Sequence, residues 1–351
     1  MSASTAARSL QDRITTAAQG PALRHLDTLS RSPLYAPAVT ALLETEMALS
    51  EQRRAGDRLL RSLTGRRSTY QRRVDQERAD RVALDASRAS LRRPPAVWWH
   101  ESGTGAPIML VNGWTASGLL WPSHLVRALD RTHRVIRVDN RGTGYARTAP
   151  SPYTIATMAD DVADVLKAST NGPAVVVGLS MGGMIAQEVA LRHPKLVTAL
   201  VLVGTRPPAP VHIPASPDVL GRALDRPGPD EPKDAFVASV WTSFCAPGFG
   251  ERRPDLVAEL VGQVLARATP QVAVNTQLRA IAAWHGPERL RKLALPTVVV
   301  HGTADRLMPV GNGMRLAQLI PGATYVELPD VGHLVPMEAS ETLADVVLGL
   351  A

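Results

Sequence analysis

Residues 176–183 read Val-Val-Gly-Leu-Ser-Met-Gly-Gly, and the interpretation of the chain begins with them. The apolar run that ends here predicts a β-strand, and the spacing of Met181–Arg192 predicts a helix. Ser180 would then stand on a sharp turn between the two. Such a turn has room only for glycine two residues to either side, where Gly178 and Gly182 are found. The pattern in this context is a nucleophile elbow, which predicts that Ser180 is presented rather than buried.

The length and the amino-acid composition are those of an ordinary soluble globular protein. The 351 residues are 45% hydrophobic and 20% charged, which allows a sizeable core. We find no apolar stretch as long as a membrane helix and no signal-peptide pattern at the amino terminus. The single cysteine, Cys245, excludes an intramolecular disulfide and a cysteine-rich metal site. We therefore expect a cytoplasmic protein without a membrane partner or a bound metal.

The net charge of +7 belongs to an amino-terminal extension. Residues 1–93 hold 17 Arg, no Lys and 10 acidic residues, whereas residues 94–351 hold 22 basic and 22 acidic residues. Helical apolar stripes between proline and glycine breaks predict weakly packed helices in this Arg-rich extension. We favour a solvated arm or a self-association element, with docking to an acidic protein partner as the alternative. We expect no nucleic-acid partner.

Strand and helix patterns alternate after residue 94, which predicts a doubly wound, mostly parallel α/β sheet. Short runs rich in β-branched residues predict strands at 97–101, 108–111, 135–138, 174–177, 200–203, 297–300 and 324–328. Helical spacing predicts helices at 119–129, 155–167, 181–192, 310–320 and 341–350.

The strand signal stops between the strands at 200–203 and 297–300. Five prolines are followed there by helical segments around 232–244 and 254–265. We therefore divide the chain into the extension (1–93), a core (94–206 and 291–351) and an inserted helical cap (207–290).

Four aromatic residues of the cap are candidates for lining a substrate pocket. They are Trp241, Phe244, Phe249 and Trp284. Burial in the core of the cap is an equally good explanation, because large aromatic side chains bury area in either setting.

A serine hydroxyl is a poor nucleophile at neutral pH, so Ser180 needs a base and a group that orients the base. The last two predicted strands supply both. Asp305 follows the first of them, and His333 follows the second beside Gly332, which permits close approach to the nucleophile. Parallel strands end at one edge of a sheet, so we expect Ser180, Asp305 and His333 to meet there.

Other assignments explain these residues less well. Asp330 is a rival acid, but it lies three residues from His333 and is better explained as a turn former. His301 ends a strand before Gly302, where a buried turn histidine is expected. The alternative for Ser180 is a loop serine that caps the following helix.

The tetrahedral intermediate of acyl transfer needs hydrogen-bond donors for its oxyanion. One expected donor is the backbone N–H of Met181, directly after the serine. The loop Asn112-Gly113-Trp114 follows another strand and should present the N–H of Trp114 as the second donor. Residues 139–144 are also rich in glycine, but they lack the third glycine and the helix of a dinucleotide site.

Five segments together make the chain resemble the α/β hydrolase family, in its capped branch of esterases, lactonases and peroxidase-like enzymes. They are residues 112–114, 139–144, 178–183, 301–305 and 332–333. The resemblance covers about residues 96–351 and implies a mostly parallel eight-stranded sheet, a lid over the pocket and no obligatory cofactor. The chain departs from the family at Asn112, where a histidine is usual, and shows no first strand before Ala96.

A serine at position 180 argues against the dehalogenase and epoxide hydrolase members, which need a carboxylate there. We expect a hydrolase that cleaves a carboxylic ester or lactone through an acyl-Ser180 intermediate. His333 would act as base and then acid, and Asp305 would hold its tautomer. A thioesterase or acyltransferase for carrier-bound acyl groups is one alternative, and a non-catalytic binding module on a hydrolase scaffold is another.

Overall fold

The computed structural model describes residues 96–149, 153–170, 172–228 and 230–351. The predicted extension over residues 1–93 lies outside these ranges. The predictions of self-association or an acidic partner for that extension therefore stay predictions.

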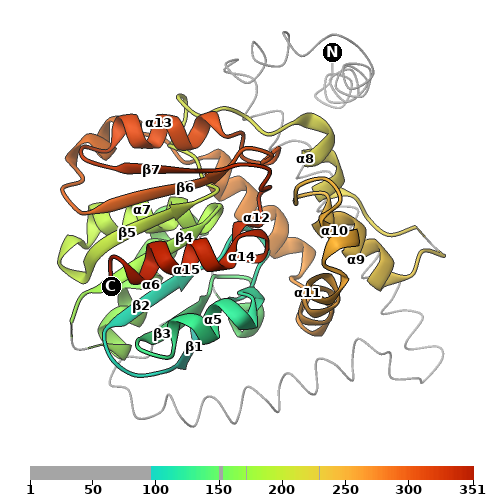
Figure 1. Ribbon diagram of the computed structural model, residues 1–351, viewed down its shortest axis with the longest axis horizontal. Helices are drawn as coiled ribbons and strands as arrows, with labels where there is room; N and C mark the ends of the chain where they lie inside the picture. Colours follow the sequence, from blue (N-terminus) through green and yellow to red (C-terminus); the bar gives the residue numbers. More distant parts are fainter. Residues whose placement is uncertain (1–95, 150–152, 171, 229) are drawn as a thin grey trace. The chain divides into compact units, whose positions relative to one another are not determined.

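Seven strands in the described residues form one sheet (Figure 1). Their order across the sheet is β1-β3-β2-β4-β5-β6-β7; β1 pairs antiparallel with β3, and the other pairs are parallel. The bounds are β1 (Trp98–Ser102), β2 (Pro107–Val111), β3 (Arg134–Asp139), β4 (Ala174–Leu179), β5 (Val197–Val203), β6 (Thr297–Gly302) and β7 (Thr324–Leu328). The doubly wound, mostly parallel α/β prediction is confirmed, with seven described strands where the family resemblance implied eight.

The position of a strand in the sheet explains its sequence pattern. β4 lies in the middle and all six of its residues are buried, so its sequence is a continuous apolar run. β1 lies at an edge, where Glu101 is exposed and apolar residues give way to polar ones. Valine dominates the central strands because β-branched side chains suit a pleated surface that is packed on both faces.

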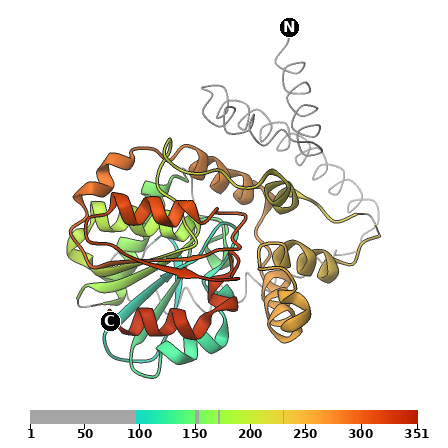
Figure 2. The same ribbon diagram turned by 45° about the horizontal axis from the view of Figure 1, so that its top comes forward.

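Helices cover both faces of the sheet (Figures 1 and 2). On one face, alternate strand residues such as Val175 and Val177 share a buried cluster with Leu125 of α5 and Leu343 of α15. α7 and α13 pack against strands on the other face, and α6 packs on α7. Each buried aliphatic side chain contributes about 1.5–3 kcal/mol to folding. The bounds are α5 (Ser123–Leu129), α6 (Ile155–Ser169), α7 (Met181–Arg192), α13 (Gly311–Leu319) and α15 (Ser340–Leu348).

One predicted helix is divided in two. The helix expected over 119–129 is interrupted at Pro122, which has φ −56° and ψ 135° and no N–H to donate. A short 3-10 helix, η1 (Gly118–Leu120), therefore precedes α5. The remaining short elements are η2 (Gly144–Ala146), η3 (Pro194–Leu196), η4 (Pro287–Lys292) and α14 (Val335–Glu338).

A helical insertion, formed by α8 to α12, lies between β5 and β6, and both views place α9, α10 and α11 beyond one end of the sheet (Figures 1 and 2). Its helices are α8 (Pro217–Leu224), α9 (Lys233–Thr242), α10 (Phe249–Arg252), α11 (Pro254–Ala266) and α12 (Gln271–Ala282). The sequence pattern does not predict α12, because the buried face of this helix includes Asn275 and Gln277 and so lacks a clean apolar stripe. In the described ranges, every helix is too short or too polar to cross a membrane.

Candidate active site

Ser180 stands between β4 and α7 in a backbone conformation that side chains rarely adopt. Its φ is 57° and its ψ is −121°. A conformation of this kind costs about 1–3 kcal/mol and persists only where neighbouring contacts enforce it. Here the N–H of Ser180 donates to the carbonyl of Val203 at 2.9 Å, and the hydroxyl of Thr205 donates to the carbonyl of Ser180 at 2.7 Å.

The glycines around the serine are required by contact. A Cβ at Gly178 would overlap the backbone of Gly182, as expected for a nucleophile elbow. A Cβ at Gly182 would instead overlap the carbonyl of Val111, at the end of β2. The turn at Ser180 therefore packs tightly against β2, the strand that leads into the loop at 112–114.

The prediction that Ser180 is presented rather than buried is wrong for this structure. Only 5% of the residue is exposed. The loop after β2 lies directly on the serine, since a Cβ at Gly113 would stand 3.1 Å from the Cβ of Ser180. The elbow does project the side chain beyond the strand, but tertiary contacts then cover it.

His333 and Asp305 form a buried pair. The Nδ1 of His333, in the loop after β7, lies 2.8 Å from Oδ2 of Asp305, in the loop after β6. The second carboxylate oxygen of Asp305 accepts the N–H groups of Leu307 at 3.0 Å and Met308 at 2.7 Å. The structure thus pairs His333 with Asp305. Asp330, the rival acid, is exposed in a turn with φ 55°.

The surroundings of Asp305 favour its charged form. Complete burial opposes ionisation, but the charge of His333 and hydrogen bonds from His301 and His333 outweigh it, so the pKa of Asp305 lies below its usual value. His301 is itself fully buried, as expected, with its Nε2 2.6 Å from the carbonyl of Met308 and 3.4 Å from Asp305.

The position of Gly204 shows that Ser180 lies close to the His333–Asp305 pair. Gly204 directly follows Val203, whose carbonyl binds the N–H of Ser180. A Cβ at Gly204 would stand 3.4 Å from both Oδ2 of Asp305 and Nδ1 of His333. The carboxyl ends of β4 to β7 therefore bring all three predicted catalytic residues to one edge of the sheet.

The loop at 112–114 is braced by asparagine where the family usually has histidine. Asn112 donates from Nδ2 to the carbonyl of Ser117 at 3.0 Å and accepts the N–H of Gly113 at 2.9 Å. Asn140, which the sequence analysis did not single out, donates to the carbonyl of Asn112 at 2.9 Å. These bonds position Trp114, the predicted second donor, while Met181, the predicted first donor, begins α7 directly after the serine.

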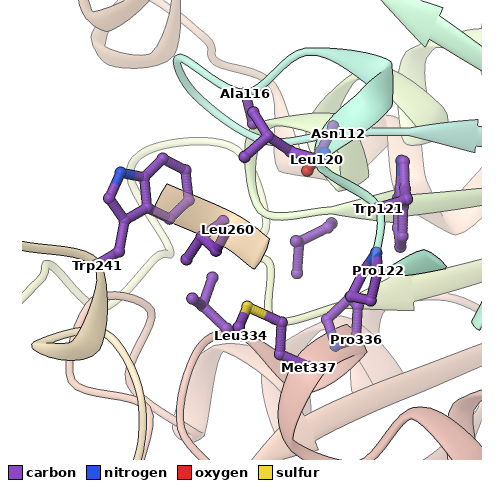
Figure 3. Close-up of a pocket in the computed structure, with 11 residues that line it drawn as sticks. Asn112, Ala116, Leu120, Trp121, Pro122, Trp241, Leu260, Leu334, Pro336 and Met337 are labelled. Carbon is purple, nitrogen blue, oxygen red and sulfur yellow. The ribbon is translucent and has the colours of Figure 1, made fainter. Parts of the chain in front are cut away.

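A small apolar pocket adjoins this edge of the sheet (Figure 3). Two of its lining residues are sequence neighbours of predicted catalytic residues, since Leu179 precedes Ser180 and Leu334 follows His333. Asn112 is the polar residue of the lining. The other lining residues are Ala116, Leu120, Trp121, Pro122, Trp241, Leu260, Pro336 and Met337.

Of the four aromatic candidates for this pocket, Trp241 lines it and the other three lie elsewhere. Phe244 and Phe249 belong to the buried apolar cluster that the insertion and the core share, next to the pocket lining but not part of it. Trp284 donates its indole N–H to Glu188 of α7 at 3.0 Å. Their assignment to the pocket is therefore corrected. The sequence pattern does not identify the lining residues Trp121, Leu260 and Met337, because it does not show which way side chains at these helix and loop positions point.

Comparisons with known proteins agree with this fold. Residues 106–340 match the family model described as alpha/beta hydrolase fold. A relative from Variovorax paradoxus, provisionally named a carbamate hydrolase, is 30% identical over 236 residues, which cover 67% of this chain and 87% of the relative. The structure of a thermophilic esterase from Thermogutta terrifontis is 27% identical with a TM-score of 0.60, covering 72% of this chain and 92% of its own. An enol-lactonase from Burkholderia xenovorans is 26% identical with a TM-score of 0.61, covering 72% and 95%.

Proposed function

Because the chain belongs to the family with the alpha/beta hydrolase fold, we propose that it is a serine hydrolase that cleaves carboxylic esters or lactones through an acyl-Ser180 intermediate. The observation that carries the proposal is the 2.8 Å pair of His333 and Asp305 beside the strained turn of Ser180. The named activities of the esterase and the enol-lactonase support an ester or lactone as the substrate.

In the first half of the reaction, Nε2 of His333 takes the proton of the Ser180 hydroxyl as Oγ attacks the substrate carbonyl carbon. Asp305 accepts the Nδ1–H of His333, which leaves Nε2 free as the base and stabilises the imidazolium that forms. The backbone N–H groups of Met181 and Trp114 donate to the oxyanion of the tetrahedral intermediate. His333 then gives its proton to the leaving oxygen as the bond to the acyl carbon breaks.

In the second half, water attacks the acyl-enzyme. His333 again takes a proton, now from the water, and returns it to Oγ of Ser180 as the acid is released. The pocket lining is apolar except for Asn112, so the acyl group held there is expected to be uncharged and apolar. A charged acyl chain would lose its hydration without gaining a partner.

The decisive experiment measures hydrolysis of p-nitrophenyl esters and of a lactone panel by the full chain and by Ser180→Ala. We expect kcat to fall by about 10⁴ to 10⁶ in the variant. Ser239→Ala, which changes an exposed serine of α9, should keep wild-type activity. A fluorophosphonate probe should label the wild type and the control but not Ser180→Ala. Ester turnover that survives the loss of Ser180 would contradict the proposal.

A further inference from the structure

His301 of β6 is a fully buried histidine that takes no part in the proposed reaction steps. Its Nε2 lies 3.4 Å from Oδ2 of Asp305, the same oxygen that binds Nδ1 of His333 at 2.8 Å. Oδ2 of Asp305 therefore lies between two imidazole rings. The residues before His301 in the strand are the buried valines Val299 and Val300. A polar ring that follows them into the interior is costly unless its groups are hydrogen-bonded.

The shorter contact of His301 is to the backbone of Met308. Nε2 of His301 lies 2.6 Å from the carbonyl oxygen of Met308. A carbonyl oxygen can only accept a hydrogen bond, so Nε2 carries the proton and donates it. The N–H of Met308 in turn donates to Oδ1 of Asp305 at 2.7 Å. Two hydrogen bonds through one residue thus connect His301 to the carboxylate of Asp305.

These two bonds close the loop that carries the carboxylate, residues 303–308. The first half of the loop is held by backbone bonds, since the N–H groups of Thr303 and Ala304 donate at 3.0 and 2.9 Å to carbonyls at the end of β7 and in the loop after it. In the second half, one backbone bond from the insertion reaches the carbonyl of Arg306 at 2.9 Å. The bond from His301 to Met308 ties the far end of the loop back to β6.

The helix α13 fixes the orientation of the His301 ring. α13 packs against β6 (Figure 1), and a Cβ at Gly313 would stand 2.7 Å from Nδ1 of His301. The backbone of α13 therefore covers that side of the ring. Nδ1 is buried and has no hydrogen-bond partner among the described residues. Because an unpaired polar atom destabilises the interior, packing alone does not explain a histidine here, whereas the donor at Nε2 does.

We propose that His301 is a positioning residue for the reaction: by donating to the carbonyl of Met308, it closes the loop around Asp305 and fixes the carboxylate that orients His333. This inference rests on the proposed function, because it needs Asp305 and His333 to act on Ser180. The place of the hydrogen-bond donor is what matters for this role, since a displaced carboxylate no longer holds the imidazole in line with the nucleophile.

The test compares three substitutions of His301 in the full chain, assayed with p-nitrophenyl butanoate at a temperature well below Tm. His301→Leu removes the donor and should lower kcat by about 10- to 100-fold, with KM within about twofold. The amide nitrogen of His301→Gln reaches the position of Nε2, so its kcat should stay within about threefold of the wild type. The amide of His301→Asn reaches only the position of Nδ1, so this variant should lose as much as His301→Leu.

The control is His285→Leu, which changes an exposed histidine between α12 and η4. It should match the wild type in kcat, KM and Tm. Tm is measured for every variant, so that a loss of folded protein is not mistaken for a loss of turnover. If His301→Leu fails to fold, the comparison of His301→Gln with His301→Asn decides the question.

A double variant separates positioning from a purely structural role. If His301 acts through Asp305, adding His301→Leu to Asp305→Ala should lower kcat by no more than about twofold, because the carboxylate to be positioned is already absent. Effects that multiply in the double variant would contradict the inference.

Two further outcomes would overturn the inference and leave the proposed function intact. One is a lower Tm with wild-type kcat in His301→Leu, and the other is the same kcat in His301→Gln and His301→Asn. An active Ser180→Ala would overturn both the inference and the proposed function.

Discussion

Single side chains set the protonation chemistry of the site. Both carboxylate oxygens of Asp305 are hydrogen-bonded, one with His333 and the other with the N–H groups of Leu307 and Met308. These contacts keep the carboxylate charged and hold the imidazole in one orientation. The proton on His333 is therefore directed to Nδ1, away from the side that faces the nucleophile in the proposed mechanism.

Replacing Asp305 with asparagine tests this arrangement. The amide of Asp305→Asn is a donor where the carboxylate is an acceptor, so it favours the tautomer of His333 that has its proton on the wrong nitrogen. We expect kcat for a p-nitrophenyl ester to fall by about 10³ to 10⁴.

Asp330→Asn is the matched control, because Asp330 is exposed and asparagine tolerates its positive φ. It should retain wild-type turnover. Equal losses in the two variants would show that the acid has been assigned to the wrong residue.

Among the secondary-structure elements, α12 binds the proposed oxyanion loop directly through hydrogen bonds. Gln277 of α12 is fully buried; it accepts the N–H of Thr115 at 2.9 Å and donates to the carbonyl of Arg141 at 2.7 Å. The indole N–H of Trp114 donates to the carbonyl of Val274, also in α12, at 2.9 Å. Thr115 has φ 64°, so the loop needs such contacts to keep its conformation.

Gln277→Leu should loosen this loop. The substitution keeps the approximate volume but removes the acceptor of the Thr115 N–H and the donor to the Arg141 carbonyl. Each lost hydrogen bond costs about 0.5–1.5 kcal/mol. We expect a lower Tm and a kcat reduced by about tenfold or more, because a displaced N–H of Trp114 stabilises the oxyanion less.

The control is Gln318→Leu, which changes an exposed glutamine of α13. It should alter neither quantity. A Gln277→Leu variant with reduced Tm but unchanged kcat would show that α12 supports the fold without positioning the loop.

Across the molecule, the apolar pocket is built from parts that are distant in the sequence. Trp241 comes from α9, Leu260 from α11, Leu120 from η1 and Met337 from α14 (Figure 3). The insertion and the core share one apolar cluster at this junction. The size of the pocket is therefore set by how the insertion packs on the core, and acyl specificity should follow it.

Trp241→Ala should enlarge the pocket and change which acyl chains fit. We expect the ratio of kcat/KM for an octanoyl to that for a butanoyl p-nitrophenyl ester to rise by about tenfold, since each added methylene in an apolar pocket contributes about 1 kcal/mol or more.

Phe249→Ala provides the comparison, because Phe249 is buried in the same cluster but does not line the pocket. It should lower stability by about 3–5 kcal/mol and leave the ratio unchanged. A ratio that responds equally to both substitutions would place the acyl site elsewhere.

Local patterns were sufficient for much of the fold. The predicted bounds of β7 and α7 coincide with the structure, because each is a clean apolar pattern bounded by turn residues. The order of Ser180, Asp305 and His333 at strand ends was also visible, since parallel strands bring their carboxyl ends to one edge. Pro122, by contrast, broke a helix that the apolar spacing alone had predicted to be continuous.

Long-range contacts decided the remainder of the site. Gln277 is a polar residue at a helix position where the chain shows no motif, and it acquires its role only because folding places it against the loop at 112–115. The burial of Ser180 and the placement of Trp284 have the same origin. The sequence by itself determined the periodicity and the order of the strands, because neighbouring residues produce them. The shape of the pocket and the bracing of the loops arise from contacts between distant segments, so only the tertiary structure decided them.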